Sequence, residues 1–384
     1  MTANDLSQAT TFPVGAAEES KEALRYYSAT QFQLIWWRFR KHRAGLIGSL
    51  VLLLMIMIGL FAEFLAPYTA TTRSAEAVLT GPQLPRFCNA GGCTLRPFVP
   101  GVISERNLET LRMETKVDLS VRRELFFFEH GESYRLLGLF KTDLHLFGVR
   151  EGTVHLFGTD SLGRDIFSRV LVATRTSLSI GVMGVLLSFV LALIIGGVAG
   201  YFGGWLDYGI QRLTEIVRVI PVIPLYMGLA AAFPQEWTST QVYFAMTLVL
   251  GVVGWPTLSR RIRGKLLTLQ GEDYVVAARL AGANPARIIG RHLLPSFISY
   301  IIIDLVISFP YVILSETALS FVGLGLRPPA VSWGVLLQDA QTIRAIEQAP
   351  WLFIPSVFVV ISVLAFTVMG DGLRDAADPY QVSG

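Results

Sequence analysis

The sequence predicts an all-α polytopic membrane protein with six membrane-spanning helices and an inserted, extracytoplasmic β-rich loop domain. Hydrophobic residues fill 52% of the 384 positions and charged residues only 16%, whereas soluble globular domains carry about 25% charged residues. The charges are also unevenly placed, because several long windows contain none. These observations exclude a disordered chain, a small disulfide scaffold and an ordinary soluble enzyme. The net charge of +3 is too small to indicate a nucleic-acid partner.

The charge-free windows mark the predicted membrane helices. About 20 mainly apolar residues cross the hydrocarbon layer of a bilayer, and six windows approach or exceed that length. They are residues 44–62, 176–206, 219–235, 237–259, 296–315 and 348–370. Asp304 is the one charge inside the fifth window. With its flanking residues, the first transmembrane helix is expected to occupy residues 44–67.

Basic residues near the ends of these windows predict the orientation, because Lys and Arg accumulate on the cytoplasmic side. Those before the first window are Arg38, Arg40, Lys41 and Arg43. Those between the fourth and fifth windows are Arg260, Arg261, Arg263, Lys265, Arg279, Arg287 and Arg291. We therefore expect both termini in the cytoplasm. Residues 1–43 are polar and precede a full-length span, which predicts a cytoplasmic N-terminal segment rather than a cleavable signal peptide.

Residues 68–157 form a segment far longer than an ordinary connection, and we expect them to form a small extracytoplasmic β-rich domain; a partly ordered excursion is the alternative. Its segments 144–148 and 154–158 repeat one alternating pattern around a glycine-containing link, which predicts a β-hairpin. Cys88 and Cys93 lie in the same loop, and two of the four residues between them are Gly. In an oxidising compartment this spacing favours a small disulfide ring; two free thiols are the alternative. The loop's His residues supply no further nearby ligands for zinc, so we expect no metal site.

The segment 271–295, between the fourth and fifth windows, is predicted to fold as two short helices joined by a turn. Asp273 can cap the first helix, and Gly282 supplies a turn where a positive φ costs little. Asn284 is a suitable N-cap for the second helix, with Pro285 at its first position. We call residues 271–295 the elbow.

The surface of the elbow suits docking of a cytoplasmic protein. Ala277 and Ala278 give the first helix a small-residue face that another surface can approach closely. Arg279 and Arg287 offer ion pairs, and Pro295 is expected to end the second helix as the chain re-enters the membrane.

This pattern resembles the EAA loop of binding-protein-dependent ABC importer permeases, placed here at about residues 256–295. The positions that match at the family's spacing are Ala277, Ala278, Gly282, Leu294 and Pro295. Val276 stands where Glu is usual, and His292 stands where Ile is usual. These departures remove one potential salt bridge and one apolar contact, but they leave the turn and both helix ends intact.

Further short strings narrow the resemblance to the dipeptide/oligopeptide/nickel permeases of the C-subunit type. They are residues 37–43, 61–68, 158–169, 319–325 and 371–375. The most specific string, at 158–169, reads GTDSLGRDIFSR. The resemblance covers roughly residues 36–68 and 157–380, so it says nothing about the role of the long loop between them.

The resemblance implies the type I ABC importer permease fold, with residues 158–384 as the permease core. It implies a homologous second permease subunit, two ATP-binding subunits docked on the EAA loops, and an extracytoplasmic substrate-binding protein. The setting would be a bacterial or archaeal cytoplasmic membrane, and peptides are the expected substrate class, although related permeases move nickel complexes and opines. The residues expected to couple to the ATPases are Asp273, Ala277, Ala278, Arg279, Gly282, Asn284, Pro285, Arg287, Leu294 and Pro295.

ATP and Mg would be used by the partner subunits. The sequence contains no Gly-x4-Gly-Lys-Ser/Thr phosphate loop. We therefore expect that this chain is not an enzyme and binds no cofactor of its own.

Asp304 and Glu316 are acids in or beside the fifth window, where charges are costly and often functional. Each could line the translocation path and meet a substrate ammonium, or serve a structural hydrogen-bonding role, which is preferred for Asp304. An ion-coupled secondary carrier using both acids is the alternative function, but it would need internal repeats with broken helices, which the sequence lacks. A third alternative is a membrane-bound enzyme with its active site in residues 68–157. The sequence argues against it, because we find no arrangement of a nucleophile and a base there.

Overall fold

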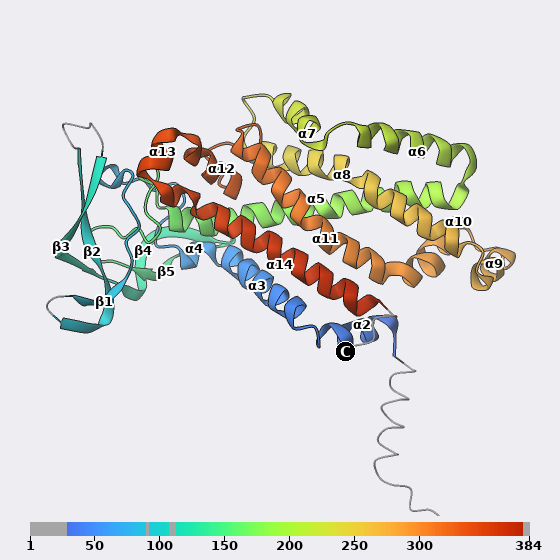
Figure 1. Cartoon of the computed structure of the whole chain (residues 1–384), viewed down its shortest axis with the longest axis horizontal. Helices are drawn as coiled ribbons and strands as arrows, with labels where there is room; N and C mark the ends of the chain where they lie inside the picture. The colour runs from blue at the N-terminus through green and yellow to red at the C-terminus, as the bar shows by residue number, and fades with distance from the viewer. Residues whose placement is uncertain (1–28, 90–91, 107–112, 379–384) are drawn as a thin grey trace, which may run out of the picture.

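The computed structural model describes residues 29–89, 92–106 and 113–378. A bundle of long helices fills most of the molecule, with β-strands gathered at one end of its long axis and the elbow at the other (Figure 1). The chain enters through α2 (Gln31–Phe39), α3 (Arg43–Leu60) and the short α4 (Ala62–Leu65). The predicted class, an all-α membrane protein with a β-rich insertion, is confirmed.

Long apolar helices form the bundle. They are α5 (Ile166–Phe202), α8 (Ser239–Leu269), α11 (Leu294–Phe321) and α14 (Ile354–Ala377), together with α3. Within the described residues, five helical stretches are long and apolar enough to cross a membrane. The predicted third span, residues 219–235, contains one short helix, α7 (Val222–Ala231), which meets the preceding α6 (Gly204–Val219) at an 86° bend. Six spans result if the bent pair crosses as one.

The centre of the bundle is the pair α5 and α8, which run in the same direction and pack closely because α5 carries glycines at the interface. A Cβ atom on Gly196 would lie 2.5 Å from the Ser259 carbonyl oxygen, and one on Gly200 would lie 3.1 Å from the Arg263 backbone. Backbones can approach this closely only where side chains are small. On the other side of α11, Phe309 stacks on Phe366 of α14 with ring centroids 4.7 Å apart.

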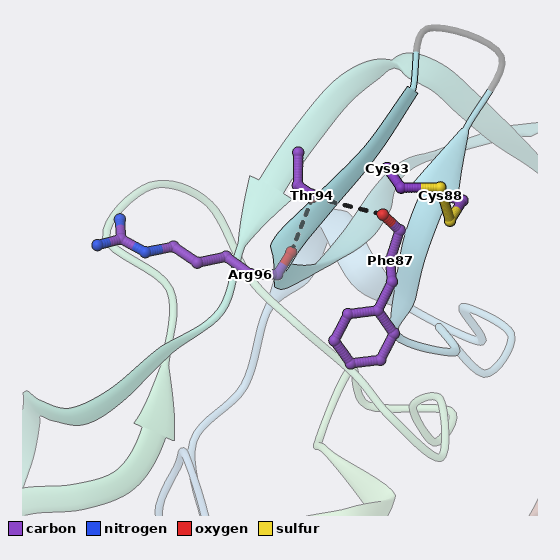
Figure 2. The surroundings of a disulfide bond; sticks show 5 residues. All are labelled: Phe87, Cys88, Cys93, Thr94 and Arg96. Atoms are coloured by element: carbon purple, nitrogen blue, oxygen red, sulfur yellow. Dashed lines mark hydrogen bonds between the residues drawn. A yellow bond between two sulfur atoms is a disulfide. The ribbon is translucent and has the colours of Figure 1, made fainter.

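The β-rich insertion contains two separate antiparallel sheets. The first contains β1 (Arg86–Asn89), β2 (Gly92–Arg106) and β3 (Met113–Glu124), in that order. The second is a hairpin of β4 (Phe126–Leu136) and β5 (Phe140–Gly148). Cys88 and Cys93 face each other across β1 and β2 and are joined by a disulfide (Figure 2). Beside it, the Thr94 hydroxyl donates to the carbonyl oxygen of Arg96 at 3.0 Å.

The hairpin predicted between residues 144–148 and 154–158 is wrong. β5 ends at Gly148 and pairs with β4 instead. The second segment runs beside residues 80–83, where the Gln83 backbone N–H donates to the His155 carbonyl at 3.0 Å. The alternating pattern identified strand-like sequence but not the partner, because pairing depends on segments distant in the chain.

Short helices complete the two ends of the bundle. They are α9 (Asp273–Leu280), α10 (Pro285–Arg287), α12 (Trp333–Gln338) and α13 (Ile343–Gln348). Single 3-10 turns occupy Ala75–Ala77, Asp339–Gln341 and Pro350–Phe353. α9 and α10 lie at the end opposite the strands, and α12 and α13 lie near the strands (Figure 1).

Candidate functional site

The elbow turns between α9 and α10 with the backbone that its sequence predicts. Gly282 has a φ of 78°, and no atom lies within 4 Å of the position that a Cβ would occupy, so the glycine is required by conformation rather than by crowding. The Asn284 side chain accepts a hydrogen bond from the Arg287 backbone N–H at 2.8 Å. Pro285 occupies the first turn of α10, where its missing N–H is not needed.

Two expectations about the elbow are wrong. Glu272, not Asp273, holds the N-cap position of α9. Asp273 lies in the first turn, where its negative charge interacts favourably with the positive end of the helix dipole. Pro295 does not end the second helix, because a π-helical turn (Ile288–Leu293) leads directly into α11 and Pro295 sits in the first turn of α11. The helical backbone breaks two residues later, at Phe297 (φ −129°, ψ 16°).

The base of the elbow is fixed to the membrane helices. Val275 of α9 and Ile288 and Leu293 of the π-helical turn are fully buried. They share a hydrophobic cluster with Ile262 and Leu266 of α8. Apolar burial of this extent holds α9 and the π-helical turn against α8 and the start of α11.

The opposite surface of the elbow is open. Leu280, at the end of α9, is 84% exposed, and Tyr274 and Val276 are each 41% exposed. The expected coupling residues that are exposed are Asp273, Ala277, Arg279, Gly282, Asn284, Pro285, Arg287 and Pro295, while Ala278 and Leu294 are half-buried. The elbow is therefore a rigid base that carries an apolar tip with small and basic residues around it.

Leu280 and Tyr274 are surface residues that the sequence reasoning missed. Helical periodicity contains the signal for Leu280. It lies five residues after the buried Val275, and at 3.6 residues per turn this spacing places the two on different faces. Val276 lies four residues before Leu280 and therefore on the same face of α9, so the two form an exposed apolar cluster of the kind that a partner surface can cover.

A cavity of about 730 Å³ is lined by residues of α5, α6, α7, α8 and α11 and opens to the surface, where its lining residue Tyr311 is 71% exposed. Most of its wall is apolar, from Val222 and Ile223 of α7 to Leu314 of α11. Asp304 of α11 and Arg261 of α8 also line it and form an ion pair with each other. The Asp304 side chain is 7% exposed and that of Arg261 is 45% exposed. The guanidinium of Arg261 is therefore the more accessible charge in the cavity, and the buried carboxylate of Asp304 neutralises it.

Glu316 turns away from that cavity into a packed polar contact. Its carboxylate is fully buried and accepts hydrogen bonds from the hydroxyls of Ser320 at 2.8 Å and Ser177 at 3.3 Å. Ser177 in turn accepts from the backbone N–H of Trp333 at 3.1 Å. Glu316 thus connects α11 with α5 and α12, which is what a structural hydrogen-bonding role requires.

A family model described as binding-protein-dependent transport system inner membrane component matches residues 171–381, more than half of the chain. The chain belongs to this family. A second model, the N-terminal TM domain of oligopeptide transport permease C, matches residues 30–82 of the permease. The β-rich insertion lies between the two matched segments. The resemblance to ABC importer permeases inferred from the elbow and the short strings is confirmed.

Curated relatives of the permease carry transport names. It is 39% identical over 59% of its length to the dipeptide transport system permease protein DppC of Bacillus subtilis (68% of that protein). It is 35% identical to the oligopeptide transport system permease protein OppC of the same organism, over 59% of this chain and 72% of that one. It is 37% identical to the glutathione transport system permease protein GsiD of Pectobacterium atrosepticum, over 59% and 73%. A solved inward facing MetNI methionine ABC transporter covers 54% of the permease and 96% of its own chain, with 20% identity and a TM-score of 0.43.

A buried charged network occupies the strand-bearing end of the permease, within the string at 158–169. Asp160 has no exposed surface. It accepts a 2.6 Å hydrogen bond from Arg164 and also pairs with Arg169. Asp339 lies 3.4 Å from Arg164 and closes the network from the distant segment after α12; burial raises the pKa of the Asp339 carboxyl, and the two arginines oppose that shift. Asp165 caps α5 by accepting from the Ser168 backbone N–H at 2.7 Å.

Proposed function

We propose that the permease is the transmembrane subunit of an ATP-driven, binding-protein-dependent peptide importer, with its elbow as the docking site for a cytoplasmic ATPase subunit. The observation that carries the proposal is the exposed Leu280 on a helix whose opposite side, at Val275, is fully buried. A partner subunit could bind the exposed face of this helix, and its movement would then be transmitted through the buried face to the membrane helices. Peptides are proposed as the substrate class because the relatives are named for dipeptide, oligopeptide and glutathione transport.

The route from the elbow to the cavity is short. The elbow packs on α8 and leads directly into α11, and both of these helices line the 730 Å³ cavity. When two ATPase subunits close on ATP and Mg, the elbow would move with them and shift the cavity wall. Repeated closure and opening would give the cavity alternating access to the two sides of the membrane.

The remaining partners are proposed because the chain belongs to the binding-protein-dependent transport family. A homologous second permease subunit would complete the path around the cavity, and a substrate-binding protein would deliver the peptide on the side of the β-rich insertion. Both termini and the elbow would then lie in the cytoplasm, in agreement with the basic residues around them. ATP hydrolysis would belong to the partner subunits. The alternative of an ion-coupled carrier gains no support, because Asp304 and Glu316 are both already engaged within the chain.

Replacing Gly282 with Val is expected to uncouple ATP hydrolysis from uptake. Holding an L-residue at a φ of 78° costs about 1–2 kcal/mol. This energy corresponds to a roughly tenfold decrease in the population of molecules whose elbow has the native turn. The permease would be reconstituted with its ATPases and binding protein, and ATP-dependent peptide uptake would be measured beside ATPase activity. We expect uptake to fall roughly tenfold while hydrolysis continues.

Two matched variants test the physical reason. Gly282→Asn should retain most uptake, because Asn tolerates a positive φ. Gly271→Val places the same side chain at an exposed elbow glycine that is equally uncrowded but has an ordinary φ, and it should behave like the wild type. Normal uptake by Gly282→Val would contradict the coupling role of the elbow.

A charge exchange tests the role of Asp304. If Asp304 and Arg261 act as a structural pair, Asp304→Ala should reduce transport because it leaves Arg261 unpaired inside the membrane. The double variant Asp304→Arg with Arg261→Asp should recover most of that loss. Recovery would be measured as peptide uptake per folded complex. If Asp304 instead binds a substrate ammonium, the exchanged pair would transport no better than the single variant.

A further inference from the structure

The β4–β5 hairpin ends in an apolar tip. Residues 136–140 read Leu-Leu-Gly-Leu-Phe, and Leu137 and Gly138 make the turn with φ values of 52° and 74°. Leu139 is 75% exposed and Phe140 is 68% exposed. Hairpin turns in water usually carry Asn, Asp, Gly or other polar residues. A run of large apolar side chains at this position therefore indicates an apolar environment outside the chain.

The hairpin reaches from the strand-bearing end of the permease to the first membrane helices, and β5 packs beside α4. Near its base, the ring of Phe147 lies 5.8 Å from that of Phe167, in the first turn of α5. Along the hairpin, the ring of Phe64 in α4 lies 6.3 Å from that of Phe128, and the His145 ring hydrogen-bonds the carbonyl oxygen of Ala66, just after α4. Closer to the tip, the ring of Tyr134 lies 4.9 Å from that of His145. Burial raises the pKa of the Tyr134 hydroxyl, and the Glu63 carboxylate adds to that rise. The hairpin thus passes from the start of α5 toward the outer end of α3.

The level of Glu63 is the edge of the membrane-spanning region. Glu63 pairs with Arg175 at 2.5 Å, and Arg175 packs on Gly59 in the last turn of α3, where a Cβ would lie 3.1 Å from the Arg175 Cα. Arg175 follows Phe167 by about 12 Å along α5, at 1.5 Å per residue, and it is the last charge before the long apolar stretch of that helix. The hairpin tip begins two residues beyond Tyr134, so it lies beside this edge.

Basic side chains flank the tip. Arg135 and Lys141 are paired in the register of the hairpin, so they share one face, and both are exposed. Leu136 and Phe140 form the next pair, on the other face. Long basic side chains can lay their stems on an apolar surface and hold their charges at the level of lipid phosphates. Apolar residues enclosed by two such side chains fit a membrane interface better than a protein groove.

We propose that the hairpin tip, residues 136–140, inserts into the outer leaflet of the bilayer, with Arg135 and Lys141 binding lipid phosphate groups. The tip then anchors the β-rich insertion beside α3 and α4. This interaction involves the lipid alone and is independent of ATPase docking, so it holds or fails separately from the proposed coupling role.

Depth-dependent quenching tests the proposal on the full-length permease. A Leu139→Cys variant would carry an environment-sensitive fluorophore, since Cys88 and Cys93 are already bonded to each other. The protein would be placed in nanodiscs of phosphatidylcholine and phosphatidylglycerol, with or without brominated acyl chains. Val121→Cys, on an exposed position of β3, is the matched control. We expect brominated lipid to remove most of the emission at position 139 and little at position 121.

A second variant tests the apolar cause. Adding Leu137→Asp and Phe140→Asp to the labelled Leu139→Cys protein should abolish the quenching, because two carboxylates at the tip disfavour insertion. Equal responses of positions 139 and 121 to brominated lipid would overturn the proposal. A label at 139 that ignores brominated lipid but responds to added substrate-binding protein would also overturn it, in favour of a protein contact.

Discussion

Replacing Asp160 with Ala is expected to lower the free energy of unfolding of the permease by about 3–5 kcal/mol. The Asp160 carboxylate is fully buried and pairs with both Arg164 and Arg169. Its removal leaves two guanidinium groups, of which Arg169 is 1% exposed, with Asp339 as the remaining acid. It also removes the acceptor for the backbone N–H groups of Leu162 and Arg164, at 2.8 and 2.9 Å. The measurement is equilibrium unfolding of the detergent-solubilised permease in denaturant.

An exposed ion pair in the same region provides the control. His130 and Asp143 lie 3.0 Å apart, but their side chains are 73% and 50% exposed. Solvent screens such pairs, and they contribute about 0–1 kcal/mol, so Asp143→Ala should leave the unfolding midpoint almost unchanged. If Asp160→Ala were no more destabilising than Asp143→Ala, the buried network would contribute nothing to stability and the expected loss would be wrong.

The same network explains where helix prediction from the sequence is incomplete. Charge-free windows locate the membrane helices because lipid leaves unpaired charges without solvation. The second window begins at residue 176, yet α5 begins ten residues earlier, at Ile166. The intervening Arg169 and Arg175 are neutralised by Asp160 and Glu63. A search for charge-free windows stops at these arginines, because it does not include the acids elsewhere in the chain that pair with them and so allow the helix to extend.

The third predicted span shows a different limit. The apolar window at residues 219–235 has the composition of a membrane helix, but the backbone leaves helical geometry at Ile220 and Pro221, where ψ is 127° and 125°. Proline disfavours helical geometry at the residue before it, so a break near Pro221 was predictable. Its 86° angle was not, because that angle depends on how α6 and α7 pack against α5 and α8.

The elbow was predictable in its local chemistry and not in its connections. Gly282 and Asn284 act through bonds within a few residues, so their turn and cap follow from the sequence. The continuation of the second helix through a π-helical turn depends on burying Ile288 and Leu293 against α8, which is a tertiary contact. The pairing of β5 with β4 is likewise non-local, and the sequence pattern alone chose the wrong partner.

Replacing Leu280 with Asp is expected to weaken ATPase docking by roughly 30-fold or more. An apolar residue that anchors the centre of an interface contributes about 2 kcal/mol or more to binding, and each 1.4 kcal/mol is tenfold in affinity. In the isolated permease Leu280 is 84% exposed, so the substitution should not change its unfolding midpoint. The affinity of the purified permease for the ATPase subunits would be measured in detergent or nanodiscs.

Leu280→Met separates loss of the apolar contact from disturbance of α9, because Met retains the apolar volume and helix propensity of Leu. It should bind the ATPase subunits within a fewfold of the wild type. A second comparison is Tyr274→Asp, which places the same charge earlier on the exposed surface of α9 and should weaken docking less if Leu280 is the central anchor. Wild-type affinity in Leu280→Asp would show that the ATPase subunits bind elsewhere, and the elbow would then lose its proposed role in transmitting closure to α8 and α11.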